Sequence, residues 1–242
     1  MALPQDFREA FRGFLDPEDP SPPPSGSGDK GLALGYPPDR FDWRGHGVLS
    51  PLRFQGNCNT CTSYASAAVI EAVHRIQGRA NIRLAPGFIH RCLLQLECEQ
   101  GAGAREVLPA VKSYGVALGF PGDEPFPPAN CNTNDLFTIS TWGWLEAVDD
   151  VLAWVGTVSP VIADLYVGRH SFPDLASGDV YSLPAGEEKI LHSVAVVGYD
   201  RPQGWALVQN SFGSSWADGG FGRIAIGSGD FLDYRGGYRV AA

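Results

Sequence analysis

The 242-residue sequence contains few basic residues and no long apolar run. Lys and Arg together number 18 against 27 Asp and Glu, so the formal net charge at pH 7 is −9. This balance argues against the basic surface with which proteins bind duplex nucleic acid or an anionic membrane, and we expect neither partner. No apolar stretch approaches the roughly 20 residues of a membrane-spanning helix. We interpret the acidic excess as a solvated surface.

Cysteine is also scarce, and the first 30 residues lack the basic start and apolar core of a secretory signal peptide. Four of the five cysteines can close two disulfides, which favours an oxidising compartment. We therefore expect a secreted or other extracytoplasmic protein, whose signal has been removed or which is exported by another route. The fifth cysteine is left as a free thiol that needs an explanation. The five are Cys58, Cys61, Cys92, Cys98 and Cys131.

Residues 1–40 differ in composition from the rest of the chain. Residues 6–15 predict a short amphipathic helix, with Phe7, Phe11 and Phe14 on one face. Residues 16–28 are so rich in Pro, Ser and Gly that they predict an extended linker. We interpret residues 1–40 as an N-terminal extension.

Residues 41–242 change from helical to strand-like patterns near residue 125. The run from Cys61 to Gln77 has small and apolar residues at intervals of three and four and is followed by Gly78, which predicts a buried central helix. Further helical patterns cover residues 86–98 and 104–114. Short Val- and Ile-rich runs then predict strands of an antiparallel sheet or barrel at residues 159–167, 193–199, 205–209 and 222–226. We predict an α+β fold, with a mainly helical lobe (41–125), a mainly β lobe (126–242) and a cleft between them.

Three motifs carry a cysteine, a histidine and an asparagine in the order that thiol proteases use. Cys61 ends the loop Gln55-Gly56-Asn57-Cys58-Asn59-Thr60-Cys61, His192 heads an apolar run, and Asn210 follows another. Taken singly, these would be a small buried hydrophobe, a core histidine and a turn residue. His192 and Asn210 follow Cys61 by 131 and 149 residues, within the roughly 130–150 residues expected for one class of thiol proteases.

Together with Asp42-Trp43-Arg44 and the segment from Asn210 to Trp216, these motifs resemble the papain family of cysteine peptidases over residues 41–242. The resemblance implies a two-lobed papain-like fold and hydrolysis of peptide bonds through a thioester on Cys61. It implies His192 as the acid and base, Asn210 as the residue that orients it, and Gln55 as an oxyanion donor with the Cys61 N–H. It further implies a monomer without metal or organic cofactor. Its partners would be peptide or protein substrates and protein inhibitors of such proteases.

The remaining four cysteines would be structural. The resemblance implies the disulfides Cys58–Cys98 and Cys92–Cys131, although four cysteines allow three pairings. A rival interpretation is that Cys58-x-x-Cys61 belongs to a thiol–disulfide oxidoreductase or to half of a zinc site. No βαβ pattern surrounds it and no second Cys-x-x-Cys is present, which disfavours both.

The sequence departs from the family pattern at four places. Thr62 follows the nucleophile where the family has an aromatic residue, and Asn59 replaces a glycine. Phe212 stands where tryptophan is usual. The segment from Cys98 to Gly103 replaces the usual Cys-x-Gly-Gly. None of these changes removes a catalytic group, so we interpret the chain as an outlying member with its own substrate preference.

The resemblance also assigns substrate-binding positions, namely Gly101, Gly103, Ala163, Asp164, Ser193 and Trp216. If Asp164 points into the pocket for the side chain two residues before the scissile bond, it would favour a basic or polar group there. If the strand register differs by one residue, Ala163 lines the pocket and an apolar preference follows.

Two alternatives to hydrolysis remain. The same site could serve a ligase, a transglutaminase or a deamidase, or the fold could bind peptides or inhibitors with little turnover. Papain-like enzymes are usually made as zymogens with a prosegment far longer than residues 1–40. Those residues are therefore a minimal plug in the cleft, a cleavage remnant or a plain tail, and the plug gives the aromatic face of residues 6–15 a place to be buried.

Overall fold

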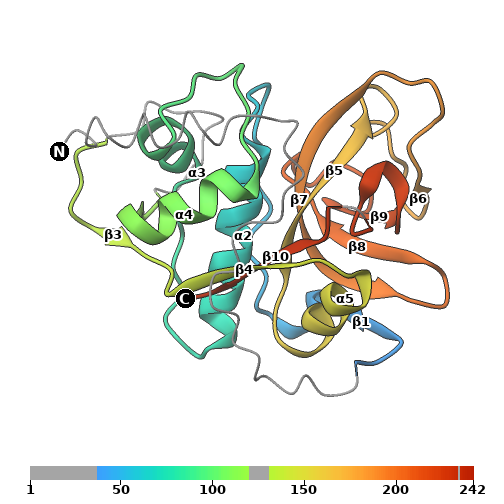
Figure 1. Cartoon of the computed structure of the whole chain (residues 1–242), viewed down its shortest axis with the longest axis horizontal. Coiled ribbons are helices and arrows are strands. Elements are labelled where there is room, and N and C mark those ends of the chain that lie inside the picture. Colours follow the sequence, from blue (N-terminus) through green and yellow to red (C-terminus); the bar gives the residue numbers. More distant parts are fainter. Residues whose placement is uncertain (1–36, 120–130, 234) are drawn as a thin grey trace.

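The computed structural model describes residues 37–119, 131–233 and 235–242. The helix and linker expected within residues 1–36 lie outside these ranges. Figure 1 shows the short helices of the first half on one side, the sheet of the second half on the other, and helix α2 between them. This arrangement confirms the α+β prediction.

The first half is built around α2 (Cys61–Ile76), which is the central helix that the apolar spacing predicts. It packs against α3 (Pro86–Phe88), α4 (Ala104–Tyr114) and strands of the sheet, so almost its whole surface is buried. The helical pattern predicted for residues 86–98 ends earlier. After α3 comes the π-helical turn η2 (Ile89–Leu93), and Gln95 then adopts a positive φ of 55°, which no helix accommodates.

The second half forms one sheet in the order β4-β10-β5-β7-β8-β9-β6. Its long central strands are β5 (Val161–Gly168) and β7 (Lys189–Asp200), and β8 (Trp205–Gln209) and β9 (Phe221–Ala225) follow. These four coincide with the strands predicted from the Val- and Ile-rich runs. The pairing is antiparallel except between β6 (Val180–Tyr181) and β9, which are parallel. The sheet is therefore antiparallel, as predicted, apart from the parallel pair of β6 with β9.

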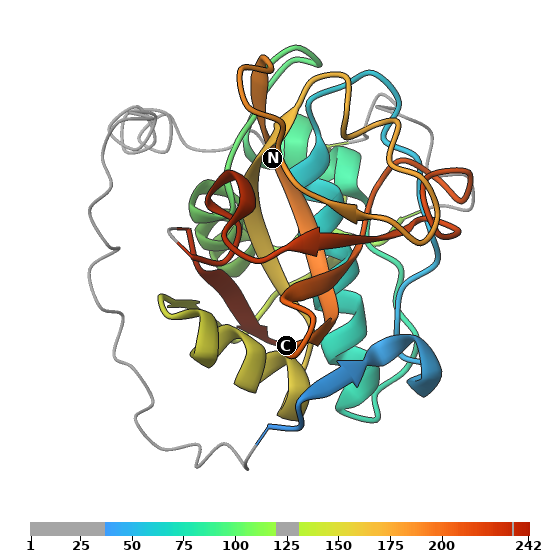
Figure 2. The same ribbon diagram turned by 90° about the vertical axis from the view of Figure 1, so that its right-hand side faces the viewer.

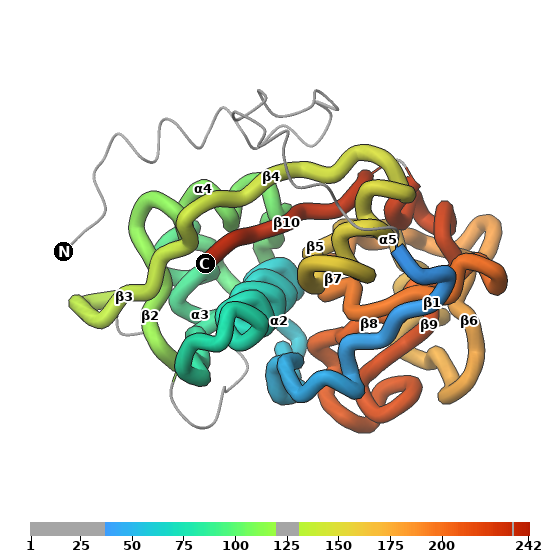
Figure 3. Tube along the Cα trace, turned by 90° about the horizontal axis from the view of Figure 1, so that it is seen from below, coloured from blue at the N-terminus to red at the C-terminus, as the bar shows by residue number. Residues whose placement is uncertain are grey.

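Two elements join the halves in a way that sequence patterns did not predict. Strand β1 (Arg40–Asp42) pairs with the end of β7, although it precedes the helices in the chain. Strand β10 (Gly237–Ala241) pairs with β5 and with β4 (Thr141–Leu145), and it contacts α2. Seen from below, β4 and β10 run together from the sheet toward the helical half (Figure 3). The N-terminal strand β1 thus extends the sheet of the second half, and the C-terminal strand β10 contacts the central helix of the first half.

The remaining elements are short. Helix α5 (Val148–Thr157), which the strand-like texture of this region concealed, lies beside β1 at one end of the sheet (Figure 2). Strands β2 (Val116–Ala117) and β3 (Leu136–Phe137) form a separate pair. The 3₁₀ turns η1 (Trp43–His46) and η3 (Ser228–Asp230) complete the order. No helix in the described ranges has the length and apolarity needed to cross a bilayer.

Candidate active site

Cys61 is the first residue of α2, and it is the free cysteine of the chain. The other four form the disulfides Cys58–Cys98 and Cys92–Cys131. Thr60 occupies the N-cap position without a side-chain hydrogen bond to the helix. The unpaired N–H groups and partial positive charge of the first helical turn therefore face the Cys61 thiol and favour its ionised form.

His192 and Asn210 come from neighbouring strands. His192 lies near the start of β7 and Asn210 directly after β8, which is paired to β7. His192 Nε2 lies 2.8 Å from Asn210 Oδ1, and the same oxygen accepts a 2.8 Å hydrogen bond from the Ser211 N–H. Because Oδ1 is fixed as an acceptor, Nε2 of His192 carries a proton. The other ring nitrogen, Nδ1, is then left for the Cys61 thiol, with which His192 shares a hydrogen bond.

The pKa values of Cys61 and His192 shift in opposite directions. Burial alone would raise the pKa of Cys61, but the charge and hydrogen bond of His192 outweigh it, so the pKa falls below the usual 9.0. Burial alone would lower the pKa of His192, but Cys61, followed by the hydrogen bond to Asn210, raises it above the usual 6.5. Each group thus stabilises the charged form of the other, which is the condition for a thiolate–imidazolium pair.

An aromatic cluster surrounds the histidine. The ring of Phe212 lies 5.1 Å from that of His192, and the ring of Phe172 lies 5.3 Å from it. Trp216 packs against both phenylalanines and donates its indole N–H to the Phe172 carbonyl at 3.0 Å. Phe172 is fully buried in the loop between β5 and β6, and no pattern in the sequence pointed to it.

Gln55 lies close to the nucleophile and is held at both ends of its amide. Its Nε2 donates to the Cys58 carbonyl at 2.8 Å, and Ser211 Oγ donates to its Oε1 at 2.5 Å. Its backbone N–H donates to the Ser211 carbonyl at 2.8 Å. The amide is therefore anchored to the residue after Asn210, and one of its two Nε2 hydrogens is used by Cys58.

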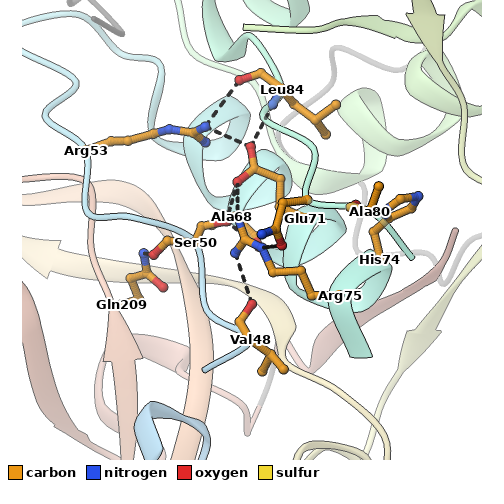
Figure 4. Close-up of polar contacts among 11 residues, drawn as sticks. Val48, Ser50, Arg53, Ala68, Glu71, His74, Arg75, Ala80, Leu84 and Gln209 are labelled. Atoms are coloured by element: carbon orange, nitrogen blue, oxygen red, sulfur yellow. Dashed lines mark hydrogen bonds and ion pairs between the residues drawn. The ribbon is translucent and has the colours of Figure 1, made fainter. Parts of the chain in front are cut away.

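A buried ionic cluster supports the chain on both sides of the site (Figure 4). The Glu71 carboxylate, in the middle of α2, accepts from Arg53 Nη2 at 2.7 Å, from the Leu84 N–H at 2.7 Å and from Ser50 Oγ at 2.5 Å. The Ser50 carbonyl in turn accepts from Gln209 Nε2 at 3.0 Å. The loop that precedes Gln55 and the strand that precedes Asn210 are therefore both fastened to the helix of Cys61. The prediction of a buried helix from its small and apolar residues gave no role to Glu71.

The proposed substrate-binding residues fall into three groups. Gly101 and Gly103 lie in the loop between the Cys58–Cys98 disulfide and α4. Asp164 pairs with Ser193 across β5 and β7 and hydrogen-bonds to it, whereas Ala163 pairs with Val194 and is fully buried. Trp216 is only 4% exposed within the aromatic cluster. Within the described residues, no cluster of three His, Cys, Asp or Glu side chains has the geometry of a metal site.

A cysteine at a helix N-terminus, paired with an asparagine-oriented histidine from the facing sheet, defines a thiol hydrolase. Sequence comparison identifies the family. Residues 37–233 match the model of the papain family of cysteine proteases, and the chain belongs to that family.

Three relatives of this chain share about a quarter of its aligned residues. The chain is 27% identical to macrodontain-1 of Ananas macrodontes over 195 residues, which are 77% of this chain and 88% of that protein. It is 26% identical to a cysteine protease of Blomia tropicalis over 219 residues, which are 81% of this chain but 65% of that protein. A cathepsin L-like proteinase of Phaedon cochleariae is also 26% identical, over 89% of this chain and 69% of its own length.

Solved structures share the fold. The bromelain protease of Ananas comosus in complex with the E64 inhibitor superimposes with a TM-score of 0.70 at 22% identity, covering 84% of this chain and 99% of that one. The digestive procathepsin L2 proteinase of Tenebrio molitor larval midgut gives a TM-score of 0.71 at 26% identity, covering 88% and 70% respectively. The fold is thus papain-like, as the sequence motifs predicted.

Proposed function

We propose that this cysteine peptidase hydrolyses peptide bonds through a thioester on Cys61. The observation that carries the proposal is the hydrogen-bonded series Cys61–His192–Asn210, with its thiol at the start of α2. The Cys61 thiolate attacks the carbonyl carbon, and the His192 imidazolium gives its proton to the leaving amine. His192 then takes a proton from water, and the resulting hydroxide attacks the thioester and releases the acid. Asn210 holds the ring orientation throughout.

The oxyanion of each tetrahedral intermediate needs hydrogen-bond donors that are in place beforehand. The backbone N–H of Cys61 and the second Nε2 hydrogen of Gln55 are suited to this role. Ser211 and Cys58 hold the Gln55 amide at both ends, so the donor does not have to reorganise when charge develops.

For substrate binding, we assign the peptide main chain to the Gly101–Gly103 loop, where the absence of side chains permits close approach. The strand register favours Asp164 and Ser193 over Ala163 as the residues beneath the pocket for the second side chain before the scissile bond, because they share one face of the sheet. Trp216 would contribute to substrate binding indirectly, by supporting the ring of Phe212 against which it packs. Peptides and proteins are the expected substrates, and protein inhibitors of papain-like proteases are expected partners of a monomer.

The two disulfides favour an oxidising compartment, so we propose that the protein acts outside the cytoplasm.

The direct test is labelling with an epoxide of the E64 type, followed by intact mass and peptide mapping. We expect one label per chain at Cys61 in the wild type and almost none in His192→Ala. Stoichiometric labelling at Cys61 with hydrolysis of a short peptide supports the proposal, whereas no labelling of a folded wild-type protein would refute it. Transfer of the acyl group to an added amine in preference to water would favour a ligase or transglutaminase, and release of ammonia from glutamine peptides a deamidase.

We further propose that the N-terminal extension, residues 1–40, restrains activity as a plug, which is tested by deleting residues 1–36. Deletion should stop there, because the Pro38 carbonyl accepts from Tyr199 and the next residues pair with β7. If the plug hypothesis holds, the truncated protein will cleave a short peptide faster than the full chain at equal folded concentration. Equal or lower activity would leave residues 1–36 as a tail or remnant.

A further inference from the structure

Four oxygen atoms form a continuous series beneath the Cys61–His192 pair. Thr62 Oγ1 lies 2.5 Å from the Ala102 carbonyl oxygen and 2.6 Å from Ser193 Oγ. Ser193 Oγ lies 2.6 Å from Asp164 Oδ1. Thr62, Ser193 and Asp164 are all at least 95% buried, since their exposed fractions are 3%, 2% and 5%. Each of the three contacts therefore needs a hydrogen from within the series.

Counting those hydrogens assigns the protonation state of Asp164. The Ala102 carbonyl can only accept, so the single hydroxyl hydrogen of Thr62 is used there. The contact between Thr62 and Ser193 then requires the Ser193 hydrogen. The contact between Ser193 and Asp164 is left without one unless Asp164 carries a proton on Oδ1. Three contacts need three hydrogens, and an ionised Asp164 would leave only two.

The surroundings of Asp164 also favour its neutral form. Burial, the largest influence, raises the pKa of Asp164. A Ser193 hydrogen donated to the carboxylate would oppose that rise, but in this series the hydrogen is donated to Thr62. The Ala104 N–H and the more distant Arg235 and Arg105 also oppose it. Another carboxyl faces it, because a Cβ at Gly103 would lie 3.2 Å from Glu106 Oε2 and 3.5 Å from Asp164 Oδ2. Burial, the largest influence, raises the pKa of Glu106 to about 7, and an ionised Asp164 would contribute to that rise. The titratable and charged groups around Asp164 are thus Cys61, His192, Glu106, Arg105, Arg235 and Tyr238.

The series connects the two halves of the catalytic pair. Thr62 follows Cys61 on α2, and its hydroxyl lies 3.9 Å from the Cys61 sulfur. Ser193 follows His192 on β7, and its backbone hydrogen bond helps to stabilise the thiolate. Asp164, on β5, thereby fixes the hydroxyl that lies between the helix of the nucleophile and the strand of the base.

We propose that Asp164 is a positioning residue, held as the neutral carboxylic acid, that sets the spacing of Cys61 and His192 through the series Asp164–Ser193–Thr62–Ala102. The inference rests on the proposed thiolate–imidazolium function of that pair. It also changes the expected substrate preference, since a neutral acid gives no charge to attract a basic side chain.

The experiment compares two variants of equal size on the full chain. Asp164→Asn keeps a donor toward Ser193 and an acceptor toward Ala104, whereas Asp164→Leu keeps neither. In Asp164→Leu we expect iodoacetamide to alkylate Cys61 roughly 100-fold more slowly than in the wild type, because Cys61 and His192 are misplaced. In Asp164→Asn we expect the alkylation rate to be at least about 10-fold higher than in Asp164→Leu. Iodoacetamide has no peptide side chain to occupy the substrate pocket. If Asp164 acted only in that pocket, its replacement would therefore leave the rate of Cys61 alkylation unchanged. Thr62→Val and Thr62→Ser repeat the comparison at the other end of the series if Asp164→Leu does not fold.

Two further measurements decide the protonation state. An infrared spectrum should contain a carboxylic acid band above pH 3.8, the usual pKa of aspartate, that is missing in Asp164→Asn. The pH–rate profile of the wild type should contain an ionisation that the same variant lacks. The inference is overturned if the infrared band is absent, or if the alkylation rate falls as far in Asp164→Asn as in Asp164→Leu. Unchanged alkylation rates in both Asp164→Leu and Thr62→Val would also overturn it. So would a substrate preference for Lys or Arg over Leu at the second residue before the scissile bond. Failure of wild-type Cys61 to react as a low-pKa thiolate would instead refute the proposed function, and the infrared band would still report on Asp164.

Discussion

The ionisation of Cys61 depends mainly on its neighbour His192. At their usual pKa values of 9.0 and 6.5, a cysteine would lose its proton only after a histidine had already lost its own, and no ion pair would accumulate. The lowered pKa of Cys61 and the raised pKa of His192 oppose that order. Activity should therefore rise with pH through the pKa of Cys61 and fall through that of His192, which gives a bell-shaped dependence of kcat/KM.

Replacing His192 isolates the contribution of burial to the pKa of Cys61. In His192→Ala the burial of Cys61 is left without its main counterweight, so the pKa of the thiol should rise above 9.0. The measurement is the pH dependence of alkylation by iodoacetamide, with thermal unfolding as the control for folding. An alkylation pKa that stays low in this variant would assign the lowered pKa to the start of α2 alone.

The proposed role of Gln55 as oxyanion donor is tested by Gln55→Ala. Loss of one such donor typically lowers kcat about 100- to 1,000-fold, with a smaller effect on KM. Ser211→Ala is the matched comparison, because it removes the hydroxyl that holds Oε1 but leaves the donor itself. We expect a smaller loss of kcat for Ser211→Ala, and a Gln55→Ala enzyme with nearly normal kcat would exclude the assignment.

The site residues that the sequence predicted are those that local motifs define. Cys61, His192 and Asn210 each stand at the boundary of a helix or strand that periodicity predicts. The structure brings His192 to Asn210 by a hydrogen bond and to Cys61 by ionic coupling. Phe172 is different, since it packs on His192 from a loop with no regular pattern. Such a contact depends on the path of the chain in space, which composition and spacing do not specify.

Helix α2 was predicted from the spacing of its apolar residues, but the buried ion pair of Glu71 with Arg53 was not. A glutamate is unfavourable in a buried helix position unless it is paired, and the partner, Arg53, lies in an irregular loop before the helix. The same limitation concealed α5, whose mixture of Val, Trp and Thr is as typical of strands as of helices.

The cluster around Glu71 gives a prediction of stability. Glu71→Leu leaves the Arg53 guanidinium buried without its carboxylate and should lower the free energy of unfolding by about 3–5 kcal/mol. The double variant Arg53→Met/Glu71→Leu removes both charges and should recover most of that loss. Chemical denaturation of both proteins and the wild type measures the difference. A double variant no more stable than Glu71→Leu would show that the cluster acts through its other hydrogen bonds.

At the level of the whole molecule, the two disulfides offer a matched pair. They close loops of 40 and 39 residues, so the chain-entropy model gives each about 4 kcal/mol of stabilisation. Cys58→Ala/Cys98→Ala and Cys92→Ala/Cys131→Ala should therefore lose similar stability. Only the first should also lower kcat in the folded protein, because the Cys58 carbonyl holds Gln55. Equal kcat values in the two folded variants would contradict this role of the Cys58 loop.

The division into helical and β regions could be predicted because each half has a uniform periodicity. The crossing of β1 and β10 between the halves could not, since strands of three and five residues carry little pattern of their own. Their places are set by partners that are more than 75 residues away for β10 and more than 150 away for β1.

Strand β7 is paired on both sides over its second half, with β5 and then β1 on one side and with β8 on the other. Its amide groups are therefore protected by more neighbours than those of the edge strands β4 and β6. In native-state hydrogen exchange, such a strand opens only with large parts of the molecule, whereas edges and loops open locally. His192, the proposed catalytic base, pairs with Leu165 of β5 three residues before the doubly paired part of β7 begins at Ala195. We therefore expect the strand that carries it to be anchored in the slowly exchanging centre of the protein, while fluctuations loosen the periphery.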